Sequence, residues 1–98
     1  MNKNELAEFN GYVLTESKSG YSVERADANN FGLPAIYLQS PDKFPSNNGK
    51  YAFKIDIKKI GGSDMDKVSE MLANYQKAVD AVNYFKKVMT DNQHIEFK

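Results

Sequence analysis

The 98-residue sequence contains no cysteine and no tryptophan, and it has a single histidine, His94. Without cysteine the chain forms no disulfide and carries no thiolate nucleophile or thiolate metal ligand. One histidine in a tail segment excludes multi-histidine metal sites and leaves little for acid–base chemistry. No serine or aspartate lies in a nucleophile-elbow or triad context. We therefore predict that the protein is not an enzyme and that it holds no metal or cofactor.

Long hydrophobic runs are also missing. No stretch approaches the roughly 18 apolar residues of a membrane-spanning helix, and no basic segment followed by an apolar one resembles a secretion signal. The sequence thus predicts a cytoplasmic protein without a membrane partner. An apolar share of 41% and a charged share of 27% are ordinary for a folded chain, and the length predicts one domain over residues 1–98.

Neither sign of charge is in excess, because thirteen basic residues balance thirteen acidic ones. This balance argues against binding to nucleic acid by bulk charge. Arg25 is the only arginine, and lysine lacks the planar fork that reads base edges, so sequence-specific recognition is disfavoured. Lysine and asparagine enrichment is consistent with an AT-rich bacterial or phage genome. Positive charge gathers in residues 43–62, whereas residues 1–42 are net negative.

Turn residues divide the first sixty positions into short elements. We predict a short helix over residues 2–10, hairpin strands over 12–17 and 21–25, a strand over 35–39 and a strand over 51–57. The Asn10-Gly11 pair is interpreted as the stop of the short helix. Pairing Glu16 with Tyr21 places apolar residues of both hairpin strands on one face, which supports this register.

The C-terminal third of the sequence, from Ser63 to about Asn92, has helical periodicity without a proline or glycine. Its apolar residues fall in one stripe about 140° wide, the width of a core-facing surface. The stripe consists of Val68, Met71, Leu72, Tyr75, Ala78, Val79, Val82, Phe85 and Met89. The predicted fold is therefore α+β: an antiparallel meander of three to four strands with one long C-terminal helix packed across one face.

A helix of that length suggests how the protein functions. About 28 residues rise about 42 Å, more than the roughly 33 Å width of a domain of this size. The last turns would then overhang the sheet and need covering, either by the tail over residues 94–98 or by a second polypeptide. We predict a small non-enzymatic protein-interaction or regulatory domain that contacts a partner protein, or a second copy in a homodimer, through this helix. The predicted contact residues are Ala81, Tyr84, Phe85 and Val88.

The alternative is a weak, sequence-tolerant binder of single-stranded nucleic acid. Lys50, Lys54 and Lys58 share the even-numbered face of the strand over residues 51–57, and Tyr37 is expected alongside. Cations and aromatic rings on an open sheet are the elements of such a site. Lysines on an exposed strand also prevent edge-to-edge aggregation, so their presence does not require a nucleic-acid ligand. Protein interaction therefore remains the main hypothesis.

Overall fold

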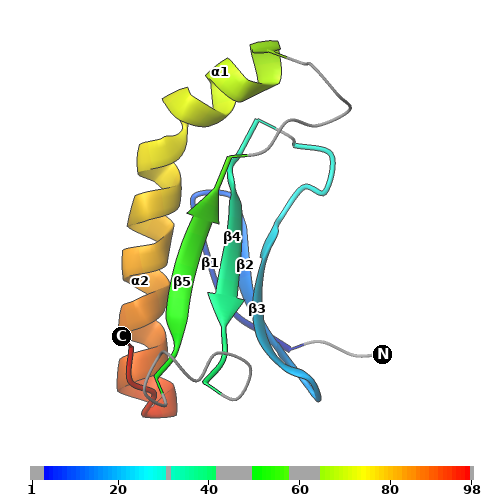
Figure 1. Ribbon diagram of the computed structural model, residues 1–98. Coiled ribbons are helices and arrows are strands. Elements are labelled where there is room, and N and C mark those ends of the chain that lie inside the picture. The colour runs from blue at the N-terminus through cyan, green and yellow to red at the C-terminus, as the bar shows by residue number, and fades with distance from the viewer. Residues whose placement is uncertain (1–3, 31, 42–49, 58–64, 98) are drawn as a thin grey trace.

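The computed structural model describes residues 4–30, 32–41, 50–57 and 65–97, with the backbone alone for residues 65–67. Its elements in chain order are β1 (Asn4–Phe9), β2 (Tyr12–Ser17), β3 (Gly20–Arg25), β4 (Ala35–Gln39), β5 (Ala52–Asp56), α1 (Met65–Ala73) and α2 (Tyr75–Gln93) (Figure 1). The predicted α+β class and the long C-terminal helix are confirmed.

The N-terminal segment is a strand, so the short helix predicted over residues 2–10 is wrong. β1 pairs antiparallel with β2, with Phe9 opposite Tyr12. Between them, Asn10 and Gly11 have φ angles of 54° and 85°. Positive φ at both central residues is what a type I′ hairpin turn requires, and Asn-Gly is its preferred sequence. This turn signal outweighs the helical pattern, because so short a helix is not stable by itself.

The second hairpin has the predicted register. Glu16 lies opposite Tyr21, and Leu14 lies opposite Val23. Leu14 is fully buried, and Val23 packs against the same core cluster. The register is therefore fixed by burial, since a slip by one residue would turn these side chains to solvent.

The described strands form two antiparallel sheets, one of which is a three-stranded meander as predicted. One sheet has the order β1-β2-β3, and the other consists of β4 paired antiparallel with β5. β3 and β4 are neighbours, but no backbone ladder joins them in the part of the chain that the structure describes. The predicted strands over residues 35–39 and 51–57 are confirmed as β4 and β5. As the alternation predicts, Phe53 and Ile55 of β5 pack against the core.

The helical segment is interrupted at Asn74, so the prediction of an unbroken helix is wrong. α1 bends over the upper end of the sheets, whereas α2 runs along their side (Figure 1). The Asn74 side chain donates from Nδ2 to the carbonyl oxygen of Gly32 at 3.0 Å. Asparagine is a weak helix former, and this hydrogen bond fixes the interruption of the helix to the loop that contains Gly32. The predicted helix start at Ser63 lies outside the described residues.

The core is built on one face of α2. Its buried residues are Ala78, Ala81, Val82, Phe85 and Met89. They pack with Tyr12 and Leu14 of the first sheet and Ile36 of the second. Within the predicted stripe, Leu72 and Tyr75 are instead 59% and 42% exposed. Leu72 belongs to α1, which buries Met71 instead, and Tyr75 is the first residue of α2, one turn before its buried face begins at Ala78.

The C-terminal tail covers the end of α2. Ile95 and Phe97 pack against the core cluster, and the Phe97 ring stacks on Phe53 with centroids 5.3 Å apart. Phe97 also forms a parallel bridge with Tyr51 beside β5. The nineteen residues of α2 rise about 28 Å. This length fits within the 39 Å long axis of the molecule. The end of α2 therefore does not overhang the sheets, and the C-terminal tail covers it.

Neither helix in the described residues combines the length and apolar character needed to cross a bilayer.

Candidate protein-interaction surface

Two of the four predicted contact residues belong to the core. The side chains of Ala81 and Phe85 have no exposed surface, so they are not part of an interaction surface and their prediction as contact residues is wrong. For Ala81 the reason is the phase of α2, whose buried face is centred closer to Ala81 than the predicted stripe. Phe85 belongs to the predicted stripe, and it is covered because the last turns of α2 do not overhang the sheets. Alanine at this position lets the helix approach the strands closely.

The other two predicted residues lie on the flank of α2. Tyr84 is 41% exposed. Val88 is partly buried and packs against the core cluster. Tyr84 therefore remains the exposed residue of the predicted patch, and Val88, one turn further along α2, is only partly accessible.

Tyr84 stacks on an aromatic side chain from β1. Its ring centroid lies 4.8 Å from that of Phe9, with an interplanar angle of 20°. Phe9 is 36% exposed. Next to this pair, the Asn10 side chain donates from Nδ2 to the Lys77 carbonyl oxygen at 3.2 Å. The end of β1 is thus fixed against α2, and the Phe9–Tyr84 pair forms an ordered aromatic surface.

The sequence interpretation missed Phe9 as a surface residue. The signal that could have found it is the Asn10-Gly11 turn. A two-residue hairpin places Phe9 opposite Tyr12 and therefore on the same face as that core residue. Strand assignment of residues 4–9 would have put Phe9 at the edge of the sheet, on the side that faces the helix.

A second group of exposed apolar residues lies at the junction of α1 and α2. Leu72 is 59% and Tyr75 42% exposed. In contrast to Phe9 and Tyr84, no ring contact fixes Tyr75 among the described residues. This group is a weaker candidate surface, because its side chains are less well held.

The lysine face is only partly assembled by the described residues. Lys54 is exposed and lies opposite Tyr37 in the β4–β5 register, and Tyr37 is 42% exposed. The Lys50 ammonium lies 3.6 Å from the Glu96 carboxylate, and its side chain is 45% exposed. Lys58 lies outside the described residues. The expected neighbour Tyr37 is therefore beside Lys54, whereas Lys50 is paired with the tail.

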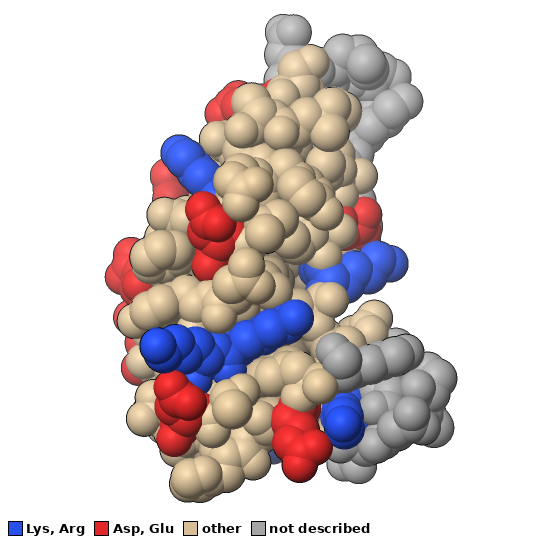
Figure 2. Space-filling view, turned by 90° about the vertical axis from the view of Figure 1, so that its left-hand side faces the viewer, with Lys and Arg blue, Asp and Glu red and all other residues tan. Residues whose placement is uncertain are grey.

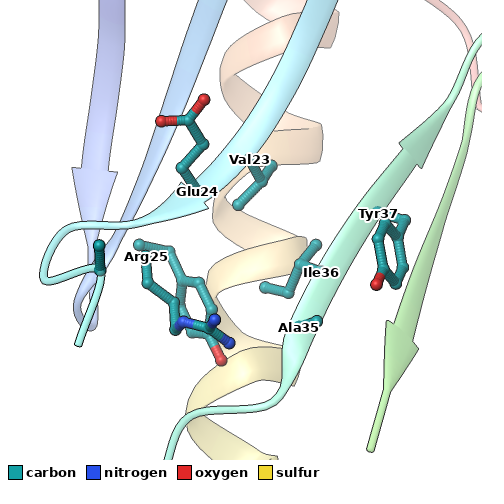
Figure 3. A pocket seen from close by; sticks show the side chains of 8 residues that line it. Val23, Glu24, Arg25, Ala35, Ile36 and Tyr37 are labelled. Carbon is teal, nitrogen blue, oxygen red and sulfur yellow. The ribbon is translucent and has the colours of Figure 1, made fainter. Parts of the chain in front are cut away.

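A cleft of about 360 Å³ lies between β3 and β4 (Figure 3). Val23 and Ile36 point into it from the two strands. Its polar groups hold the adjoining loop: the Tyr12 hydroxyl donates to the Pro34 carbonyl oxygen at 2.6 Å, and Arg25 Nη1 donates to the Leu33 carbonyl oxygen at 3.3 Å. Burial raises the pKa of Tyr12 to about 12, and the charge of Arg25 partly offsets this rise. The Tyr12 hydroxyl thus acts as a structural donor.

The outer face of the β1-β2-β3 sheet is acidic. Side chains alternate across a strand, so the positions that flank Val13 and Thr15 of β2 point away from the core. These flanking residues are Glu8 and Glu24 beside Val13, and Glu5 and Ser22 beside Thr15. Among the described outer-face positions of these strands no lysine or arginine occurs. We refer to Glu5, Glu8 and Glu24 as the acidic face, a feature that the sequence interpretation did not identify.

Comparison with known proteins finds no matching family model, no similar curated protein and no similar solved structure. Within the described residues, no group of three or more histidine, cysteine, aspartate or glutamate side chains is placed to hold a metal ion. The surfaces described above are therefore interpreted from their own geometry and chemistry.

Proposed function

We propose that this protein is a small, non-catalytic protein-binding domain that acts through the Phe9–Tyr84 pair on the flank of α2. The observation that carries the proposal is a stack of two aromatic rings, each more than one third exposed, at the surface where β1 meets the helix. Aromatic residues are enriched at protein interfaces, because they bury a large area and lose little side-chain entropy. Rings that already stack are ordered before a partner arrives, which lowers the cost of binding.

The electrostatics of the helix side support contact by uncharged groups. Figure 2 views the molecule from the side of α2, and basic and acidic side chains are interspersed there on a surface that is mostly uncharged. Such a mixture provides no extended field of one sign to steer a charged polymer. Binding on this side is therefore expected to depend on buried aromatic area and only weakly on salt.

The test compares two tyrosines of one helix. Tyr84 and Tyr75 are 41% and 42% exposed, but only Tyr84 belongs to the pair. Self-association is measured by light scattering, and a partner captured from the native host is purified and titrated by calorimetry. We expect Tyr84→Ala and Phe9→Ala to weaken the association by roughly tenfold or more, the effect of losing an interface hot spot, and Tyr75→Ala to leave it unchanged. A monomeric protein whose partners bind the Tyr84→Ala and Tyr75→Ala forms equally well would refute the proposal.

The second candidate function is weak binding of single-stranded nucleic acid on the outer face of β4 and β5. It is favoured by the cross-strand neighbours Tyr37 and Lys54, an exposed ring beside an exposed ammonium group. We expect salt-sensitive binding of a fluorescent oligo-dT that declines for Lys54→Ala and not for Lys77→Ala, an exposed lysine on α2. Absence of binding at low salt would eliminate this candidate.

A further inference from the structure

The free edge of β1 has a defined set of outward-pointing backbone groups. In a two-residue hairpin, the closing pair Phe9–Tyr12 is hydrogen-bonded, and hydrogen-bonded pairs then alternate along the strands. By this alternation, the backbone N–H and C=O of Glu8, opposite Val13, point away from β2. In the part of the chain that the structure describes, no strand pairs with this side of β1.

An irregularity in β1 directs a second residue toward the same edge. The register shifts between Glu5 and Ala7, as it does at a β-bulge. In the second hairpin, Ser17 and Gly20 close the turn, so Thr15 directs its backbone groups to Ser22 on β3. Glu5 lies opposite Thr15, and its own backbone groups must therefore point outward, like those of Glu8. The bulge makes this possible, because residues three apart on a regular strand would point to opposite sides.

The side chains next to this edge differ between the two faces of the sheet. Glu5 and Glu8 belong to the acidic face, and both are exposed. Phe9 lies on the opposite, helix-facing side, where it stacks on Tyr84. A strand that pairs with β1 would therefore place alternate side chains against carboxylates on one face and near aromatic rings on the other.

The charges of Glu5 and Glu8 also disfavour one class of partner at the β1 edge. If two copies of β1 paired antiparallel about the middle of the strand, Glu5 of each copy would lie opposite Glu8 of the other. Like charges directly opposite each other destabilise a sheet, and charged residues and bulges on an edge discourage self-pairing. The same carboxylates attract a basic strand. The edge thus disfavours a second copy and favours a cationic partner.

We propose that the open edge of β1 receives an extended segment of a partner protein in which lysine or arginine alternates with apolar residues, and that this segment extends the β1-β2-β3 sheet by one strand. Main-chain hydrogen bonds at Glu5 and Glu8 hold the segment, and its basic and apolar side chains select it. This inference rests on the proposed protein-binding function and specifies the class of partner.

The experiment uses the ¹⁵N-labelled full chain and two synthetic peptides of equal length, one alternating lysine with valine and one alternating glutamate with valine. We expect the lysine peptide to shift the amide resonances of Glu5 and Glu8 in a salt-dependent way, and the glutamate peptide to leave them unchanged. Glu8→Gln removes the charge and retains the amide. Glu8→Pro also removes the outward N–H, which an edge strand tolerates. We expect Glu8→Gln to weaken binding several-fold and Glu8→Pro to weaken it further.

A charge reversal keeps the test decisive if Glu8→Pro fails to fold. In the double variant Glu5→Lys, Glu8→Lys the preference should change to the glutamate peptide. Equal binding of both peptides, or unperturbed Glu5 and Glu8 amides, would overturn the inference. If a captured partner still depends on Tyr84 while the lysine peptide leaves β1 unaffected, the proposed function stands and only the strand-addition inference fails.

Discussion

At the turn between β1 and β2, Gly11 has a φ of 85°, and a Cβ added there would lie 3.1 Å from Leu33 Cδ1. Alanine at this position would combine backbone strain with a close contact to a flexible side chain. We expect Gly11→Ala to lower the free energy of unfolding by about 1–2 kcal/mol, measured by urea denaturation. Asn10→Gly is the control, since glycine accepts positive φ, and it should cost less than about 1 kcal/mol. Equal stability of Gly11→Ala and the wild type would contradict the turn geometry.

Tyr12 gives a prediction for alkaline pH. Burial raises its pKa from 10.0 to about 12 in the folded protein, so the folded state retains a proton that the unfolded state loses. The stability that depends on this proton is fully present below pH 10 and is lost as the pH rises to 12. We expect the stability of the wild type to fall more steeply over this range than that of Tyr12→Phe, which lacks the ionisable group. Parallel curves from denaturation at several pH values would show that Tyr12 does not contribute.

At the level of elements, the adjacent residues Tyr84 and Phe85 test the phase of α2. Phe85 is fully buried, whereas Tyr84 is 41% exposed. Phe85→Ala should destabilise the protein by about 3–5 kcal/mol through a lost core side chain and the cavity that remains. Tyr84→Ala should cost about 1 kcal/mol, mainly the contact with Phe9. Similar losses for the two variants in thermal or urea unfolding would mean that the core face of α2 is assigned incorrectly.

The strands were predictable where a local pattern and a turn agree. The β2–β3 register follows from pairing Glu16 with Tyr21, because the loop and the apolar face favour the same alignment. β5 follows from strict alternation of Phe53 and Ile55 with polar residues. β1 was missed because the Asn-Gly signal was assigned to a helix end, although it belongs to a hairpin.

The break between α1 and α2 could not be predicted from local sequence. The residues around Asn74 contain no proline or glycine, and its contact is with Gly32, 42 residues away. The same limitation explains the incorrect assignment of Ala81 to an exposed patch, since the phase of α2 is set by tertiary packing. Phe85 was placed in the apolar stripe, and it was expected to be accessible only because the helix was predicted to overhang the sheets. Tyr84 is exposed, as its prediction as a contact residue requires. Its partner Phe9 depends on the β1 pairing that was missed.

For the whole molecule, the tail joins α2 to the second sheet. The Tyr51 amide donates to the Glu96 carbonyl oxygen at 3.0 Å, and Phe97 stacks on Phe53. We expect Phe97→Ala to lower stability by about 1–3 kcal/mol and to accelerate hydrogen exchange at the Tyr51 amide. A matched control is Glu96→Ala, which removes only an exposed ion pair and should have little effect. Unchanged exchange at Tyr51 in Phe97→Ala would show that the tail is held in another way.

The position of α2 in the chain has a consequence for biosynthesis. α2 contacts both β1 and β5, yet it follows all five described strands in the sequence. During translation the apolar faces of the two sheets therefore emerge from the ribosome before the helix that covers them. Nascent chains stalled before Tyr75 should be captured by chaperones and be prone to aggregation, whereas chains that have exposed α2 should become resistant to protease.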